Sequence, residues 1–330
     1  MTLARRFPSA APLLAGTALL ACALLSACGS SSARASGPGR QDGSDRSGSE
    51  SLTSASAAPK GHHTPECASD GGWSCEQQKR LAAAAKYMDQ QAAENGYLSV
   101  VLTDRRTGRT WRHGPTDHPG WTASTVKLAM ATDILMRARS GEVTMTDADH
   151  HDMDTMLNFS DNNAADRLWE RFGGDEQLAR FRQVFGMTDL NFIPGFTNGA
   201  YWGFVKCTSE DLSHLMNYVL SDTDPTDRDY LVTAMRGVAE NQQWGVWAAG
   251  ADQQPGNKDG WSHESDPYGK HWVLDSVGFA GPDERYTIGI MFQVAPDGTI
   301  DYGAHTVSDV VSLLFGKSVG STTVVPEPDD

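Results

Sequence analysis

Patterns typical of β-strands lie at both ends of the folded part of the chain, and patterns typical of helices fill the middle. Residues 97–114, YLSVVLTDRRTGRTWRHG, alternate apolar and polar side chains about a turn at Thr107-Gly108 and predict a hairpin. Residues 271–293 again predict strands, and residues 303–316 predict a closing helix. The sequence therefore predicts an α/β (α+β) fold, in which an antiparallel sheet is flanked by helices and carries an inserted helical subdomain.

Helical patterns occupy the segments around these strands. Residues 76–96 are a long amphipathic stretch that ends at Gly96. The remaining predicted helices share apolar residues at three- and four-residue intervals and cover residues 121–135, 146–174, 175–186, 208–222 and 227–238. We find no internal repeat, so the chain predicts one folded domain rather than an array.

The first 28 residues have the pattern of an export signal. Arg5 and Arg6 precede a short apolar run that ends in LSAC at Cys28. These last four residues resemble the lipobox of bacterial lipoproteins, in which the cysteine is acylated and becomes the new N-terminus. We expect an extracytoplasmic, lipid-anchored protein on the outer face of the cell membrane. An ordinary signal peptide whose cleavage site contains a cysteine is the alternative.

Composition sets the domain boundaries. Residues 29–75 are rich in Ser, Gly and Ala and have almost no large apolar side chain, which predicts a disordered tether. The folded domain is expected over residues 76–318, followed by a disordered tail over 319–330. The formal charge of −15 argues against nucleic acid as a partner, because phosphates would repel such a chain. We expect a monomer whose contact with the membrane is made by its N-terminal lipid only.

The cysteines allow disulfides and predict no metal site. Cys22 leaves with the signal, whereas Cys67, Cys75 and Cys207 remain in a compartment that permits oxidation. A Cys67–Cys75 bond would close a short loop, but the sequence leaves the pairing open. No Cys or His spacing matches a metal site, and we expect neither metal nor cofactor.

A serine and a lysine begin the helix predicted within residues 121–135, WTASTVKLAMATDIL. Lys127 follows Ser124 by three residues, a spacing that puts both side chains on one helix face. They are either a surface pair or a nucleophile with its base. A serine hydroxyl reacts poorly until a neighbour takes its proton, and a desolvated lysine whose pKa is lowered can do so.

Two further motifs follow in chain order, SDN at residues 160–162 and KDG at residues 258–260. Ser-x-x-Lys alone occurs by chance about once in a chain of this length. Together, however, the three motifs resemble those of the serine β-lactamase and penicillin-binding-protein superfamily, and the resemblance covers about residues 76–316. KDGW at residues 258–261, with QQWGVWAAG upstream, looks like a branch of secreted serine-hydrolase lipoproteins.

The resemblance implies a role for each polar residue of the motifs. Ser124 forms an acyl-enzyme and Lys127 is its base. Ser160 passes the proton to the leaving nitrogen, and Asn162 holds Lys127 or the substrate amide. Lys258 supplies positive charge to Ser160 and to a substrate carboxylate.

The third motif also supplies the expected substrate-binding strand. The backbone N–H of Trp261, together with that of Ser124, is expected to form the oxyanion hole, with Gly260 beside it. Asp259 stands where the family usually has Thr or Ser, whose hydroxyl binds the substrate carboxylate. We expect the Asp259 carboxylate to lie about 5 Å from that group and to repel it.

Two other departures concern the helical block. Fewer residues separate the two serine motifs than in class A β-lactamases. Those enzymes carry Glu-x-x-Leu-Asn, in which the glutamate activates the deacylating water, whereas MTDLN at residues 187–191 has Met187 in that place. Residues 190–209 contain no Asp or Glu. We therefore expect slow deacylation.

The favoured function is that of a β-lactamase-like serine hydrolase or acyltransferase, acting on a small-molecule or peptide amide or ester of the cell envelope. A true class A β-lactamase is one alternative. A catalytically weak binding or sensing module on the same fold is the other. The five polar motif residues favour chemistry, because a binding module has no need to keep all of them.

Overall fold

The computed structural model describes residues 72–91, 96–193, 201–266 and 269–320, all within one compact unit formed by residues 63–330. The expected signal segment, the lipidation site Cys28, Cys67 and nearly all of the tether and tail lie outside the described residues. In the described part, no helix combines the length and the apolar character needed to cross a membrane.

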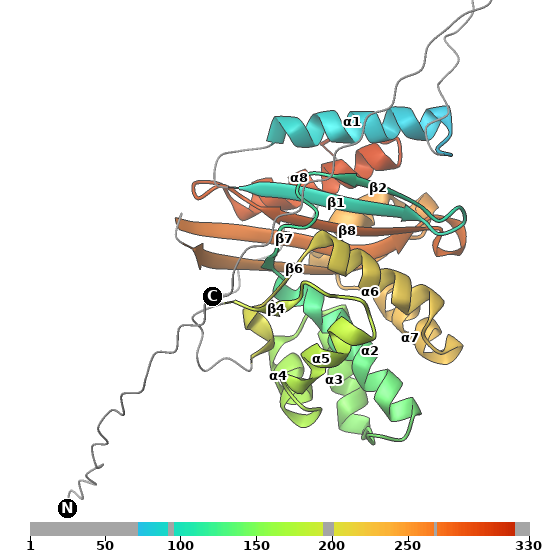
Figure 1. Cartoon of the computed structure of the whole chain (residues 1–330), viewed down its shortest axis with the longest axis vertical. Coiled ribbons are helices and arrows are strands. Elements are labelled where there is room, and N and C mark those ends of the chain that lie inside the picture. The colour runs from blue at the N-terminus through green and yellow to red at the C-terminus, as the bar shows by residue number, and fades with distance from the viewer. Residues whose placement is uncertain (1–71, 92–95, 194–200, 267–268, 321–330) are drawn as a thin grey trace, which may run out of the picture. The chain divides into compact units, whose positions relative to one another are not determined.

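Five strands form the main sheet, in the order β2-β1-β8-β7-β6, and every neighbouring pair is antiparallel. They are β1 (Tyr97–Asp104), β2 (Arg109–His113), β6 (Gly256–Asp266), β7 (Gly269–Ala280) and β8 (Tyr286–Gln293). The hairpin predicted at residues 97–114 is confirmed. Val100 of β1 lies opposite Ile290 of β8, so strands from both ends of the chain share the sheet, as predicted (Figure 1).

Helices cover both faces of this sheet. One face packs against α1 (Cys75–Gln91) and α8 (Ile300–Leu314), which lie together at the top of Figure 1. The other face carries the helical subdomain, formed by α2 (Val126–Arg139), α3 (Asp147–Asn158), α4 (Asn162–Arg171), α5 (Glu176–Gln183), α6 (Ser209–Ser221) and α7 (Pro225–Arg236). A small second sheet contains β3 (Gly120–Trp121), β5 (Val205–Cys207) and β4 (Asn191–Phe192), in that order.

One predicted boundary differs from the structure. Residues 146–174, expected as one helical stretch, form α3 and α4 because the chain breaks at Ser160, whose φ is +60°. Asp161 then caps α4 by accepting a hydrogen bond from the Ala164 N–H at 2.7 Å. The KDG motif lies inside β6, an edge strand of the main sheet, where a substrate-binding strand was expected.

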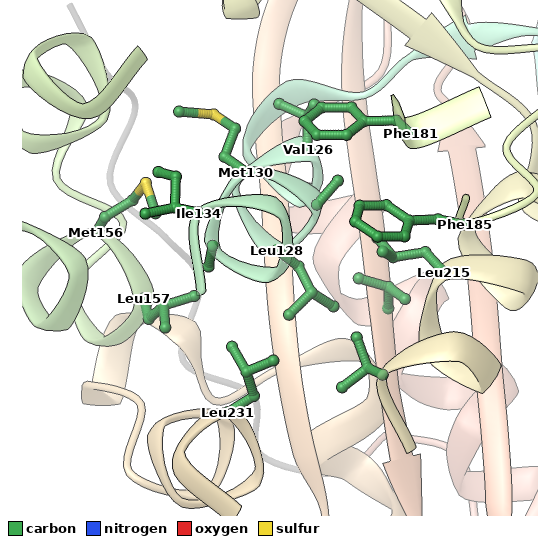
Figure 2. Packing of buried hydrophobic residues seen from close by; sticks show 14 of the residues in the cluster. Val126, Leu128, Met130, Ile134, Met156, Leu157, Phe181, Phe185, Leu215 and Leu231 are labelled. Carbon is green, nitrogen blue, oxygen red and sulfur yellow. The ribbon is translucent and has the colours of Figure 1, made fainter. Parts of the chain in front are cut away.

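The helix that begins with Ser-x-x-Lys lies at the centre of the larger core. Residues 126–135 of α2 are all buried, since the helix is enclosed by the sheet and its neighbouring helices. Figure 2 shows Leu157 of α3, Leu215 of α6 and Leu231 of α7 around Leu128 of α2. Close packing on every side fixes the position of this helix and keeps water away from its first turns.

Candidate active site

A tight turn holds Ser124 at the start of α2. Ser124 belongs to a 3-10 helix, η1 (Ala123–Thr125), and is 8 % exposed. The Thr125 N–H and hydroxyl both donate to the Thr122 carbonyl, at 3.0 and 2.6 Å. Ala123 adopts a φ of +41°, a conformation that costs an ordinary residue about 1–3 kcal/mol and persists only where its surroundings impose it. The turn is therefore held by its neighbours rather than by local preference.

Lys127 is completely buried and bonded to the SDN motif. Its Nζ donates to the Ser160 carbonyl at 2.7 Å and to Asn162 Oδ1 at 2.6 Å, and it lies 3.2 Å from Ser160 Oγ. A neutral amine has two N–H groups and one lone pair. The Ser160 carbonyl and Asn162 Oδ1 can accept both N–H groups of the neutral amine, and neither contact uses its lone pair. The geometry thus suits a base, and it brings Asn162 onto Lys127.

Lys258 reaches the same hydroxyl from the opposite side. Its Nζ donates to Ser160 Oγ at 2.9 Å and to the Asp259 carbonyl at 2.7 Å, and the side chain is completely buried. Because the two amines lie 3.2 and 2.9 Å from one oxygen, they are at most about 6 Å apart. Two ammonium charges at about 6 Å repel by about 3 kcal/mol at an effective dielectric of about 20. One positive charge on the pair is therefore favoured over two.

Gly260 lets β6 approach the turn that carries Ser124. Side chains alternate along a strand, so position 260 faces the same side as Lys258. A Cβ at this position would lie 2.7 Å from the Ser124 nitrogen, 2.8 Å from the Thr125 nitrogen and 2.9 Å from the Thr122 oxygen. These are contacts with backbone, which cannot rotate away. The third motif thus meets the first backbone to backbone, and only glycine fits.

Trp261 faces the opposite side of β6 and is part of the core. Its ring is 7 % exposed and packs edge-on against Trp244, with centroids 6.3 Å apart. The side chain therefore contributes packing. The oxyanion role expected for its backbone N–H stays a prediction.

Asp259 also faces away from the side occupied by Lys258, and here the sequence-based expectation needs correction. Its carboxylate is 0 % exposed, and its Oδ1 accepts a hydrogen bond from the Ser276 hydroxyl of β7 at 2.5 Å. A carboxylate enclosed in this way cannot approach a substrate carboxylate, because β6 itself lies between them. The expected distance of about 5 Å between the Asp259 carboxylate and a substrate carboxylate is therefore wrong.

Burial instead perturbs the acid–base behaviour of Asp259. Desolvation raises its pKa to about 7, although hydrogen bonds from Ser276 and Asn257, attraction by Lys258 and the Trp244 N–H all lower it. Burial likewise holds the pKa of Asp275, on β7, well above its usual range. Asp259 is thus a buried carboxyl that ionises close to neutral pH.

Two residues outside the motifs also contact the lysines. Gln242, at the end of a short 3-10 helix (Glu240–Gln242), accepts from Lys258 Nζ at 3.4 Å through its Oε1. Trp202, in another 3-10 helix (Trp202–Phe204), lies with its ring centroid 4.5 Å from Lys127 Nζ. Its indole N–H donates to Asp166 Oδ1 of α4 at 2.7 Å. Trp202 was not predicted from the sequence as a site residue. The only signal was the stretch 190–209, which contains Trp202 and no Asp or Glu.

The other sequence candidates lie apart from this site. Met187 is a fully buried core residue. Cys75 and Cys207 are both free thiols, the first exposed and the second buried. Within residues 72–320, apart from the gaps, no group of three or more His, Cys, Asp and Glu side chains is placed to hold a metal.

Sequence comparison relates the chain to proteins named as lipoproteins. No family model matches the chain. The protein named "Putative lipoprotein LppW" from Mycobacterium tuberculosis (strain ATCC 25618 / H37Rv) is 29 % identical over 236 residues, which are 69 % of this chain and 72 % of that protein. The same figures hold for its namesake from Mycobacterium bovis.

Solved structures of similar fold include class A β-lactamases and a β-lactamase from Burkholderia vietnamiensis. An ancestral class A enzyme is 18 % identical with a TM-score of 0.56, and the match covers 71 % of this chain and 98 % of that one. A β-lactamase from Burkholderia vietnamiensis is 19 % identical with a TM-score of 0.58, covering 74 % and 97 %.

Proposed function

We propose that this chain, which has the fold of class A β-lactamases, is a serine hydrolase or acyltransferase that works through an acyl-enzyme on Ser124. Its substrate would be an amide, ester or peptide of the cell envelope. One observation carries the proposal: two fully buried lysines, Lys127 and Lys258, converge on Ser160 Oγ at 3.2 and 2.9 Å. Burying two amines is costly, and a purely structural role gives no reason to aim both at one hydroxyl.

The proposed acylation step uses each of these groups. Ser124 Oγ attacks the substrate carbonyl, and neutral Lys127 takes the hydroxyl proton. The carbon–nitrogen or carbon–oxygen bond of the substrate then breaks, and the leaving group receives a proton through Ser160. Lys258, as the charged member of the pair, stabilises negative charge that develops near Ser160. The backbone N–H groups of Ser124 and Trp261 are the expected oxyanion donors.

Trp202 favours slow hydrolysis of the acyl-enzyme. Its indole covers one side of Lys127 and is 4 % exposed, so it fills space that a water molecule beside the amine would need. The stretch 190–209 offers no carboxylate to activate such a water. An acyl group on Ser124 would therefore wait for another nucleophile, such as an amine or an alcohol, which supports acyl transfer.

A second candidate is hydrolysis of β-lactam antibiotics, which the fold of the neighbouring structures favours. The two candidates differ in the lifetime of the penicilloyl-enzyme. Rapid turnover of a penicillin would make the β-lactamase function the better one.

The test is intact-protein mass spectrometry after exposure to a penicillin and, separately, to a small activated ester. We expect one acyl group per chain, located on Ser124, with at least one of the two reagents. Ser124→Ala should form no adduct. Lys127→Met should also form none while keeping its folded circular dichroism, because methionine retains the apolar stem and removes only the amine.

Two results would contradict the proposal. The first is a wild-type protein that forms no adduct with either reagent under conditions in which it is folded. The second is an adduct that persists in Ser124→Ala, which would place the nucleophile elsewhere. Acylation of Lys127→Met at the wild-type rate would remove Lys127 from the role of base.

We also propose lipid anchoring through Cys28. The relative named as a lipoprotein supports it, and so does the LSAC sequence. An anchored domain on a tether would meet substrates on the outer face of the membrane.

A further inference from the structure

Two charged neighbours in β6, Lys258 and Asp259, are both completely buried, on opposite faces of the strand. The Lys258 amine bends back to donate to the carbonyl of Asp259 at 2.7 Å. The two side chains are neighbours along the strand and are shielded from water, so a positive charge on Lys258 attracts the Asp259 carboxylate. A buried carboxylate next to a buried amine therefore needs an explanation beyond packing.

Residues 242–246 also connect Lys258 and Asp259, through hydrogen bonds. Gln242 contacts Lys258 Nζ, and its backbone carbonyl accepts from Asn257 Nδ2 at 2.9 Å. Four residues later, the Val246 N–H donates to Ser276 Oγ at 3.0 Å, and the same hydroxyl donates to Asp259 Oδ1. Residues 242–246 are thus bonded to Lys258 at one end and to the Asp259–Ser276 pair at the other.

Few other charged groups face Asp259. Lys258 comes from its own strand, and Asp275 comes from β7. The segment 244–246 presents backbone N–H groups, and α8 presents the hydroxyl of Ser308, which accepts from the Gly245 N–H at 3.0 Å. Burial raises the pKa of Asp275 well above its usual range, which opposes a negative charge on that carboxyl. Asp259, the direct neighbour of Lys258 in β6, is the carboxyl placed to balance its charge.

We propose that Asp259 is a positioning residue that keeps the positive charge on Lys258 and so leaves Lys127 as the uncharged base. The inference rests on the proposed function and explains how two buried lysines divide their roles. The two amines share Ser160 Oγ, so a proton held on Lys258 opposes a second proton on Lys127. Of the two lysines, Lys258 is the direct neighbour of Asp259 in the strand, so attraction by that carboxylate favours the charge on Lys258.

The direct test follows the lysine amines by NMR. Protein labelled with ¹³C at lysine Cε is titrated, and the signal of Lys258 is assigned by its loss in Lys258→Met. In Asp259→Asn we expect the Lys258 amine to lose its proton at a pH at least about one unit lower than in the wild type. Asp275→Asn is the matched control. It changes the neighbouring buried carboxyl on β7, whose Oδ1 accepts from the Phe292 N–H, and it should shift the Lys258 titration much less than Asp259→Asn does.

A second readout is the acylation rate of Ser124 against pH. In the wild type the rate should rise as Asp259 ionises near neutral pH, and Asp259→Asn should lack this step. Ser276→Ala keeps the carboxyl but removes its hydrogen bond, so the step should move to higher pH. This variant also carries the test if Asp259→Asn fails to fold.

The outcomes separate the inference from the proposed function. If Lys258 loses its proton at the same pH in the wild type and in Asp259→Asn, the inference is overturned, whatever the acylation results are. If Ser276→Ala leaves both readouts where they were, that result overturns it as well. If Lys258 titrates as expected but no reagent acylates Ser124, the inference stands and the proposed function fails.

Discussion

Replacing Asp259 by asparagine should stabilise the protein above about pH 5, with the full effect at neutral and alkaline pH. Burial raises the pKa of Asp259 from 3.8 to about 7 in the folded protein. The folded state therefore holds the proton more tightly than the unfolded state, whose carboxyl has a pKa of about 3.9. The stability this provides is complete below about pH 4 and is lost as the pH rises through about 7.

The size of the effect follows from that difference in pKa. About three pKa units at about 1.4 kcal/mol each give a loss of about 4 kcal/mol above pH 7. Asparagine avoids this loss because it does not ionise, and its Oδ1 can still accept from Ser276. Its amide N–H groups, however, would face the Trp244 N–H, which we expect to cost about 1 kcal/mol. The net expectation is a gain of about 3 kcal/mol at pH 8 and a small loss, about 1 kcal/mol, at pH 4.

The assay is equilibrium unfolding in urea for both proteins at pH 4, 6 and 8. At pH 8 the midpoint of thermal unfolding should also rise, by about 6–12 °C for a domain of this size. A difference in stability that is the same at all three pH values would refute the reasoning, because the carboxyl would then not ionise within this range. A gain in stability together with a changed acylation profile would indicate that the charged residue is kept for function.

Three further changes have definite expected outcomes. Gly260→Ala should slow acylation of Ser124 by at least about tenfold and destabilise the protein by about 1–3 kcal/mol, because the new Cβ overlaps the Ser124 turn. Equal acylation rates in the variant and the wild type would contradict the backbone contact. Trp202→Ala should shorten the lifetime of the acyl-enzyme by admitting water beside Lys127. Trp202→Phe keeps a ring there and should change the lifetime less. An unaltered lifetime in both variants would show that the indole does not exclude the water. Cys28→Ala should release the protein from the membrane into the medium, as judged by fractionation, and a variant that stays in the membrane fraction would rule out the lipid.

Much of the fold was readable from local sequence patterns. The alternation and the Thr107-Gly108 turn in residues 97–114 identified the hairpin, and the apolar runs of 271–293 identified the strands that pair with it. Helix starts are equally local. Thr146 with Asp149 and Thr208 with Asp211 each form a capping box, in which both partners lie within four residues. Such signals need no knowledge of distant residues.

The motifs gave the residues of the candidate site but not all of their orientations. Lys127, Ser160, Asn162 and Lys258 are brought together as the resemblance implied. For Asp259 the expected surroundings were wrong. Neighbouring residues of a strand face opposite sides, so its position relative to Lys258 directs it toward Ser276 and away from the site.

The sequence by itself determined the type and order of the elements and the chemistry available at Ser124, Lys127 and Lys258. Only the tertiary structure decided that Trp202 covers Lys127 and that residues 242–246 join Lys258 to Asp259. These contacts join residues far apart in the chain, and no periodic pattern or short motif records them. They arise because the helical subdomain and residues 242–246 pack against the sheet and enclose these side chains. A polar group that is buried in this way needs a hydrogen-bond partner that is also buried.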